Sequence, residues 1–157
     1  MLNRKAALIE ALDEAYNRKS WHGTNLRSSL RRISPEEAVA RLKRGSHNIW
    51  EIAVHAAYWK YVVRRRIVGL KRGSFPLKGT DWFPRPQTVS KAAWEEDLRL
   101  LDGEHVKLRE AIESLSEKDL DRKSGELTLA ALIRGVTAHD LYHAGQIQLL
   151  KRIFRSK

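Results

Sequence analysis

The apolar residues of this chain recur at the spacing of amphipathic helices. After Ser90, whose hydroxyl can cap a first turn, apolar side chains and one histidine repeat in steps of four and three without a miss. These positions are Trp94, Leu98, Leu101, His105, Leu108, Ile112 and Leu115. The repeat predicts a long helix that buries one face against the rest of the protein.

Three other segments show the same period. The first runs from about Leu2 to Tyr16, the second begins near Ile49 and ends near Gly69, and the last follows Thr128. One stripe of the second contains Ile49, Ile52, His55, Trp59, Val62 and Val63. One face of the last contains Leu129, Leu132, Val136, His139, His143, Ile147, Leu150 and Phe154. Because no segment alternates apolar and polar residues long enough to compete as a strand, the pattern predicts an all-α protein.

The connecting segments carry capping and turn signals. Ser34 as N-cap, Pro35 at the first helical position and Glu37 at the third indicate a capping box that opens a short helix. Residues Leu70–Val89 hold most of the prolines and predict a long irregular crossover. Gly125 marks a turn before the last helix. The whole pattern predicts a four-helix bundle with a long crossover between its second and third helices.

Length and composition narrow the class of protein. A chain of 157 residues fits a single four-helix-bundle domain, spanning residues 1–157. The chain has no cysteine, which excludes disulfides, thiolate nucleophiles and zinc ribbons, so a metal would need histidine, carboxylate or water. The first residues form no apolar signal segment, and no run is long enough to span a bilayer. We therefore expect a soluble, cytoplasmic protein with no membrane partner.

The charge balance is strongly basic. Lysine and arginine number 30 against 19 aspartates and glutamates, a net charge of +11 that would attract anionic partners or substrates. The clusters are Arg27 with Arg31–Arg32, Arg41 with Lys43–Arg44, Arg64–Arg66, and Lys71–Arg72. Nothing resembling a known nucleic-acid-binding module accompanies them, so solvated helix faces are favoured over a nucleic-acid surface.

Three histidines are candidate metal ligands. His139 and His143 lie four residues apart, so on a helix they project from one face, one turn apart, as two ligands of one ion do. A histidine on a core stripe can equally be a core residue satisfied by a hydrogen bond. His55 falls on the core stripe of a different helix. Three imidazoles from two helices could converge on one ion and leave a position open for water or substrate, which favours a catalytic site over a closed structural one.

Two more candidates lie near these stripes on other helices. His105, on the stripe of the third helix, could be a fourth ligand, a donor to a ligand or a plain core histidine, and the last is favoured. Glu51, one turn before His55, could be a base or an orienting carboxylate, although an ordinary solvated residue, one that could pair with neighbouring basic side chains, is slightly preferred. The remaining histidines, His22 and His47, adjoin Gly or Ser in connecting segments and are interpreted as surface residues.

The last helix contributes two polar candidates of its own. Asp140 takes the place that a glutamate base has in the HExxH motif of zincins, but aspartate is one methylene shorter, so that role does not carry over. We expect Asp140 to hold an imidazole or to pair with a basic side chain. Gln146, three residues after His143, can donate a hydrogen bond to a ligand or to bound water.

Two stretches carry a resemblance to a known family. The sequence NIWEIAVHAAYWK at 48–60 and the sequence HDLYHAGQI at 139–147 resemble the DinB/YfiT-like superfamily of metal-dependent enzymes, which is distinct from the DNA polymerase that shares the label. The resemblance covers nearly the whole chain, and the HxxxHxGQI ending is its most specific part. It implies an up-up-down-down four-helix bundle, a homodimer, and a divalent metal held by His55, His139 and His143.

The resemblance also implies a class of chemistry. Characterised relatives include transferases and isomerases that use low-molecular-weight thiols such as bacillithiol or mycothiol. Our leading hypothesis is a metal ion that lowers the pKa of a thiol or of water, with the basic charge attracting an anionic thiol. The alternatives are a metal-dependent hydrolase and a non-enzymatic protein that binds nucleic acid or an acidic partner. Imidazole ligands suit zinc, nickel, iron, copper and often manganese, so they do not fix the metal; we expect zinc or nickel first, then iron or manganese. Trp82 and Phe83 of the crossover could line this site, fill the bundle end or form a dimer interface.

Overall fold

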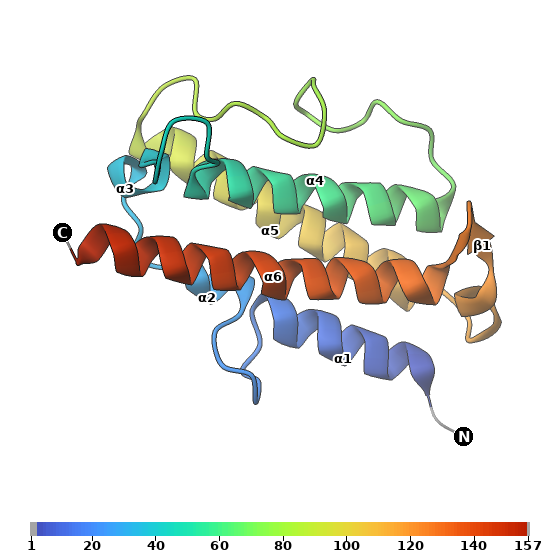
Figure 1. Ribbon diagram of the computed structural model, residues 1–157. Coiled ribbons are helices and arrows are strands. Elements are labelled where there is room, and N and C mark those ends of the chain that lie inside the picture. The colour runs from blue at the N-terminus through green and yellow to red at the C-terminus, as the bar shows by residue number, and fades with distance from the viewer. Residues whose placement is uncertain (1–2, 157) are drawn as a thin grey trace.

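The computed structural model describes residues 3–156, so Leu2, at the expected start of the first helix, lies outside the described residues. Four long helices form a bundle (Figure 1): α1 (Arg4–Tyr16), α4 (Ile49–Val68), α5 (Lys91–Glu113) and α6 (Leu129–Arg155). The shorter elements are α2 (Leu26–Ser29), α3 (Pro35–Val39), the 3₁₀ helix η1 (Lys118–Asp121), β1 (Lys123–Ser124) and β2 (Leu127–Thr128). The all-α class and the bundle are confirmed.

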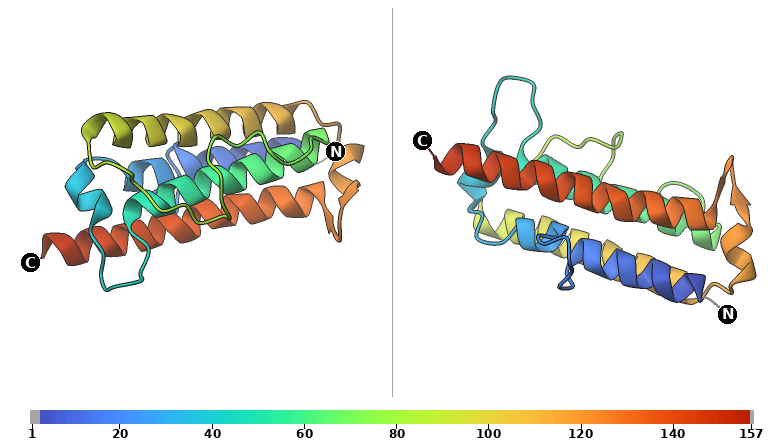
Figure 2. Two further views of the ribbon diagram at one scale, coloured as in Figure 1. Left: turned by 90° about the horizontal axis from the view of Figure 1, so that it is seen from above. Right: turned by 60° about the horizontal axis from the view of Figure 1, so that its bottom comes forward.

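The directions of the helices differ from the expected up-up-down-down order. Residues 17–48 fold into the compact α2 and α3 at one end of the bundle, so α4 begins where α1 ends and runs antiparallel to it (Figure 1). Residues 70–89 instead return along the whole length, which makes α4 and α5 parallel (Figure 2). Arg4 binds Asp121, just beyond the end of α5, so α1 and α5 are antiparallel. The order is therefore up-down-down-up, and the long crossover lies between α4 and α5 as predicted.

The start of α3 is capped differently from the prediction. The Ser34 hydroxyl accepts a hydrogen bond from the backbone N–H of Glu37, but within the described residues the Glu37 carboxylate pairs with Arg155 and not with the Ser34 backbone. The expected capping box is therefore only half formed. A complete one opens α4, where Asn48 and Glu51 each accept a hydrogen bond from the other's backbone N–H.

The starts of α5 and α6 follow the sequence signals. The hydroxyls of Ser90 and Thr128 each accept a hydrogen bond from the backbone N–H three residues on. The turn marked by Gly125 is a small hairpin, in which β1 pairs with β2 in antiparallel register. Gly125 has a φ of +69°, a conformation that favours glycine over residues with a Cβ. The hairpin is too short to show the alternation by which a strand is recognised in sequence.

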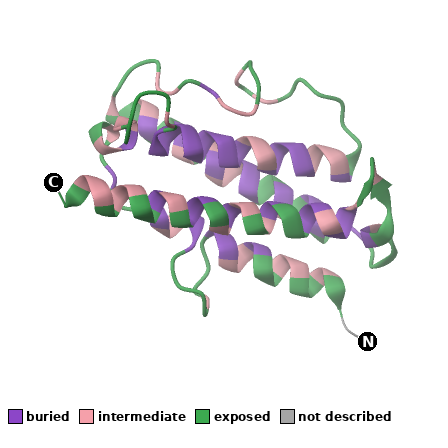
Figure 3. Ribbon diagram, viewed as in Figure 1, coloured by how far each residue is buried: buried purple, intermediate pink, exposed green. Residues whose placement is uncertain are grey.

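Helix α4 is buried over most of its surface, whereas α1 buries only Leu12, Ala15 and Tyr16 (Figure 3). The reason is the crossover, which passes over the outer face of α4 in Figure 2 and places the buried Phe83 ring 5.5 Å from the ring of Tyr58. Despite this burial, no helix among residues 3–156 is long and apolar enough to cross a membrane. Polar side chains on α4 are thereby enclosed between other elements of the protein.

Candidate metal centre

Three histidines meet where α4 packs against α6. His55 comes from α4, and His139 and His143 come from successive turns of α6. The Nε2 atom of His139 lies 3.1 Å from Nε2 of His55 and 3.0 Å from Nε2 of His143. One candidate ligand atom from each residue lies within 4.8 Å of the others. Two nitrogens bound to one ion at about 2.0–2.1 Å are themselves roughly 3 Å apart, so this spacing fits a shared metal ion.

Hydrogen bonds at the opposite ring nitrogens orient two of these imidazoles. The Nδ1 atom of His55 lies 2.7 Å from the backbone oxygen of Asp81, and Nδ1 of His143 lies 2.7 Å from Oε1 of Gln146. Because both oxygens only accept, each Nδ1 carries the proton and each Nε2 presents a lone pair. Gln146 therefore accepts a hydrogen bond from a candidate ligand through its oxygen, where the sequence led us to expect a donor.

The three imidazoles are held in the neutral form that binds metals. Burial lowers the pKa of His139 to about 3 and that of His143 to about 4, and it also lowers the pKa of His55. Within the described residues, Nδ1 of His139 is buried and has no hydrogen-bond partner. The Nε2 atoms of the triad lie close together, and those of His55 and His143 direct their lone pairs toward His139. This arrangement attracts a cation. The donor set therefore fits a divalent metal ion.

Trp82 of the crossover covers one side of the triad. Its ring stacks on His55 at 3.8 Å between centroids and on His47 at 3.6 Å, with interplanar angles of 8° and 6°. Of the alternatives left open for the two crossover aromatics, Trp82 lines the site, while Phe83 packs in the core beside Tyr58. His47, interpreted as a surface residue, has a half-exposed side chain, yet one face of its ring lies against Trp82.

Among the described residues, Glu51 pairs with Arg41 and not with a histidine of the triad. It is only 5% exposed, and its carboxylate binds the guanidinium of Arg41 at 2.5 and 2.9 Å as well as the backbone N–H of Asn48. Burial raises the pKa of this carboxyl, but the hydrogen bonds from Arg41 and Asn48 outweigh that effect and hold it below the ordinary value. The preferred interpretation is therefore wrong about the exposure of Glu51, which is buried and caps α4, although the expected pairing with a basic side chain is found in Arg41.

A second buried polar group lies deeper between the helices. Asp140 forms an ion pair with Lys60, and both side chains are fully buried. The Lys60 ammonium also lies 3.4 Å from Nδ1 of His105, whose ring stacks on Tyr16 at 3.8 Å between centroids. Burial lowers the pKa of His105 to about 3, so the neutral ring accepts from the ammonium. We call Lys60, His105 and Asp140 the buried ion-pair cluster; His105 belongs to it and not to the triad.

Two pockets adjoin the triad. One, of about 430 Å³, is lined by Trp82, His143, Gln146 and Tyr142 among others. The second, of about 170 Å³, lies between α4 and α6 and reaches His139 from the other side. The three-histidine site is thus accessible from both directions along the contact between these two helices.

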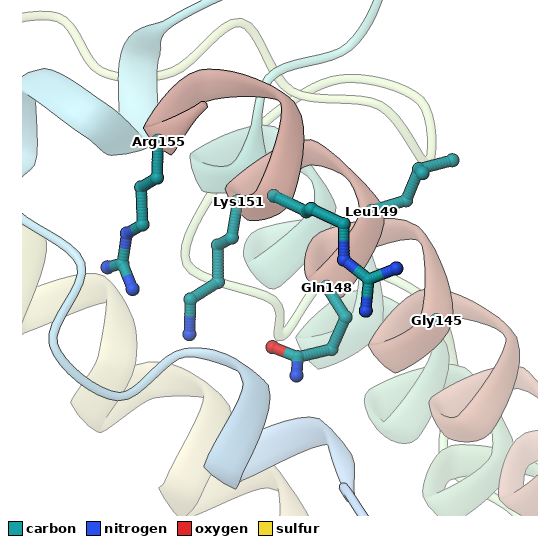
Figure 4. Close-up of a pocket in the computed structure, with 6 residues that line it drawn as sticks. Gly145, Gln148, Leu149, Lys151 and Arg155 are labelled. Atoms are coloured by element: carbon teal, nitrogen blue, oxygen red, sulfur yellow. The ribbon is translucent and has the colours of Figure 1, made fainter. Parts of the chain in front are cut away.

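A third cavity, of about 440 Å³, lies near the end of α6 and is lined by basic side chains (Figure 4). Lys151 donates to the backbone oxygens of Ser29 and Arg31, and Arg155 pairs with Glu37. These bonds join the end of α6 to the segment containing α2 and α3. The charges of Lys151 and Arg155 are therefore engaged in holding the fold together.

An all-α bundle with a three-histidine site between two of its long helices is the class that the fold and geometry define. The family model described as the DinB superfamily matches residues 18–147, a range that includes all three histidines. The chain belongs to the DinB superfamily, which is known for metal binding. No curated protein and no solved structure matches the chain.

Proposed function

We propose that this protein is a metal-dependent enzyme, in which His55, His139 and His143 hold a divalent ion, and that it transfers a low-molecular-weight thiol to an electrophilic substrate. The observation that supports this most is the approach of three neutral imidazoles through their Nε2 atoms. A divalent ion bound there, zinc or nickel in the first place, would act as a Lewis acid that lowers the pKa of a thiol or of water.

The chain's own residues supply orientation and access in this proposal. The Asp81 carbonyl and Gln146 fix the rings of His55 and His143, and second partners of this kind raise the metal affinity of a histidine. Trp82 shields one side of the site from water. The pocket of about 430 Å³ between Trp82 and Tyr142 would receive the thiol, and the net charge of +11 would attract an anionic one.

The nucleic-acid alternative is less well supported by the side-chain contacts. Members of three basic clusters are already engaged with acidic residues: Arg27 with Asp102, Arg41 with Glu51, and Arg64 with Glu104. DNA affinity that falls steeply with salt and survives removal of the three histidines would favour this alternative. The family resemblance leads us to include a homodimer in the proposal, which sedimentation of the purified protein would test.

The metal content of protein purified without a histidine tag tests the proposal directly. We expect about one divalent ion per chain in the wild type, and none when His139→Ala and His143→Ala are combined. The matched control is His22→Ala, at an exposed position outside the triad, which should keep the metal. A variant lacking all three histidines that still carried a full complement of metal would overturn the proposal.

Activity assays then separate the two reactions that the site allows. Bacillithiol and mycothiol are offered with a chromogenic electrophile, and an activated ester is offered without any thiol. Turnover that requires the thiol supports the transferase, whereas hydrolysis of the ester without a thiol supports the hydrolase. Either activity should disappear with the metal in the variant lacking His139 and His143.

A further inference from the structure

The smaller pocket beside the triad has an unusual lining. It is apolar for most of its length, with Trp59 and Val62 on α4 and Val136 on α6, and it reaches His139 at one end. Its lining also includes one permanently charged side chain, Arg66, near the end of α4. We call this pocket the Arg66 slot.

Arg66 differs from its neighbours in the run of three arginines. Arg64 pairs with Glu104, and Arg65 donates to the backbone oxygen of Leu70. Arg66 is half-buried, yet it forms no ion pair with any acidic side chain among residues 3–156. A guanidinium without a carboxylate partner is ready to bind an anion, and its planar fork matches a carboxylate.

The dimensions of the slot limit what it can hold. Its volume of about 170 Å³ is close to that of cavities of about 150 Å³ that bind benzene. The ring of Trp59 lies 6.2 Å from that of His139, and Arg66 follows Trp59 by seven residues, about 10 Å along the helix at 1.5 Å per residue. A molecule that joins the two ends therefore has an apolar body the size of one ring and an anionic group at one end.

We propose that the Arg66 slot binds a small arylalkyl carboxylate, with the carboxylate on the Arg66 guanidinium, the apolar body between α4 and α6, and the far end directed to His139. The role of this molecule as the substrate rests on the function proposed above. Its binding does not, because Arg66 and the apolar walls are not ligands of the triad.

Isothermal titration with 3-phenylpropionate and its neutral amide, 3-phenylpropionamide, tests the slot. A charge-assisted hydrogen bond to the guanidinium should make the acid bind the wild type about tenfold more tightly than the amide. Arg66→Gln should weaken the acid about tenfold and bring it to the level of the amide. Gly135→Leu should abolish binding of both ligands. Gly135 lines the slot and a Cβ added there meets no atom within 4 Å, so the leucine side chain can occupy the space that the ligand needs.

Matched controls exclude general effects of charge and folding. Arg134→Gln makes the same change of charge at an exposed position on α6 that does not line the slot, and Gly103→Leu makes the same substitution in α5. Both should bind the acid as the wild type does. Because glycine destabilises a helix, replacing a helical glycine should not lower thermal stability. Circular dichroism of both glycine variants checks that they are folded.

The titrations are run on protein as purified and after treatment with a chelator. Preference for the acid that persists without metal supports the slot even if the metal proposal fails. Equal affinity for acid and amide in the wild type, no binding of either, or an equal loss in Arg66→Gln and Arg134→Gln would each overturn the proposal for the slot. Metal content alone decides the proposal for the triad.

Discussion

The triad and the buried ion-pair cluster both place histidine on a core stripe of a bundle helix, yet they use it in opposite ways. In the buried ion-pair cluster, His105 faces the ammonium of Lys60, and the charge of that ammonium is balanced by Asp140. In the triad, the imidazoles face one another through Nε2, and no acidic side chain reaches these atoms in the described residues.

The difference lies in what the ring nitrogens face and not in how deeply the rings are buried. His105 and His143 are similarly buried, at 4% and 3% exposed, and burial lowers the pKa of both. His105 faces the ammonium of Lys60, so its Nδ1 already has a hydrogen-bond donor within the protein. His143 faces two further imidazoles, an arrangement that an added cation completes.

The largest effect should come from breaking the buried ion-pair cluster with Lys60→Met. This change leaves the carboxylate of Asp140 buried without a partner, which costs about 3–5 kcal/mol in comparable pairs. Urea denaturation should show this loss in the free energy of unfolding. Any folded fraction should still bind metal, because Lys60 is not a candidate ligand.

The double variant Lys60→Met with Asp140→Leu is the control for this prediction. It removes both charges and leaves neither unpaired, so most of the lost stability should return. If Lys60→Met unfolded at the same urea concentration as the wild type, the interpretation of Lys60 and Asp140 as a self-contained ion pair would be wrong.

A smaller effect is expected when the triad loses an orienting contact. Gln146→Leu leaves Nδ1 of His143 without its acceptor, and losing such a partner weakens metal binding by about 10- to 100-fold. Competition with a metal indicator measures this change in affinity. Gln148→Leu makes the same substitution at an exposed position on α6 and should keep the affinity of the wild type. Equal affinities in the two variants would count against a role for Gln146 in the site.

The ligand candidates could be predicted from sequence because their positions follow the helical period. His139 and His143 share a face at any bundle geometry, and His55 lies on a stripe that must face the core. The stack on Trp82 was not predicted, because the crossover has no period that relates its side chains to a helix. The sequence indicated only that the crossover contains aromatic residues, and these could have lined the site, filled the bundle end or formed a dimer interface.

Lys60 was missed for a related reason. A lysine beside an apolar stripe is ordinarily solvated. The partners that enclose Lys60 come from other helices far along the chain, with His105 on α5 and Asp140 on α6. The run from Ile49 to Ala57 is apolar on almost every face, which is typical of a helix that is buried all round. The helix directions were equally hidden, because residues 17–48 are long enough to remain at one end of the bundle or to cross it.

The smallest expected effect is the contribution of His105 to the pH dependence of the free energy of unfolding. Burial depresses the pKa of His105 from 6.5 to about 3, so as pH falls below 6.5 the unfolded chain takes up a proton that the folded chain does not. The neutral His105 therefore makes its full contribution to the free energy of unfolding well above pH 6.5, and this contribution is lost as the pH falls below that value. Between pH 6.5 and about pH 5.5 the loss should be about 1 kcal/mol.

His105→Gln removes this titration and keeps an acceptor for Lys60, so its free energy of unfolding should fall less steeply over the same range of pH. The other buried histidines titrate in both proteins, so the difference between the two slopes isolates His105. Identical slopes in the wild type and His105→Gln would show that His105 is not held neutral in the fold, and the contrast between the two histidine clusters would then disappear.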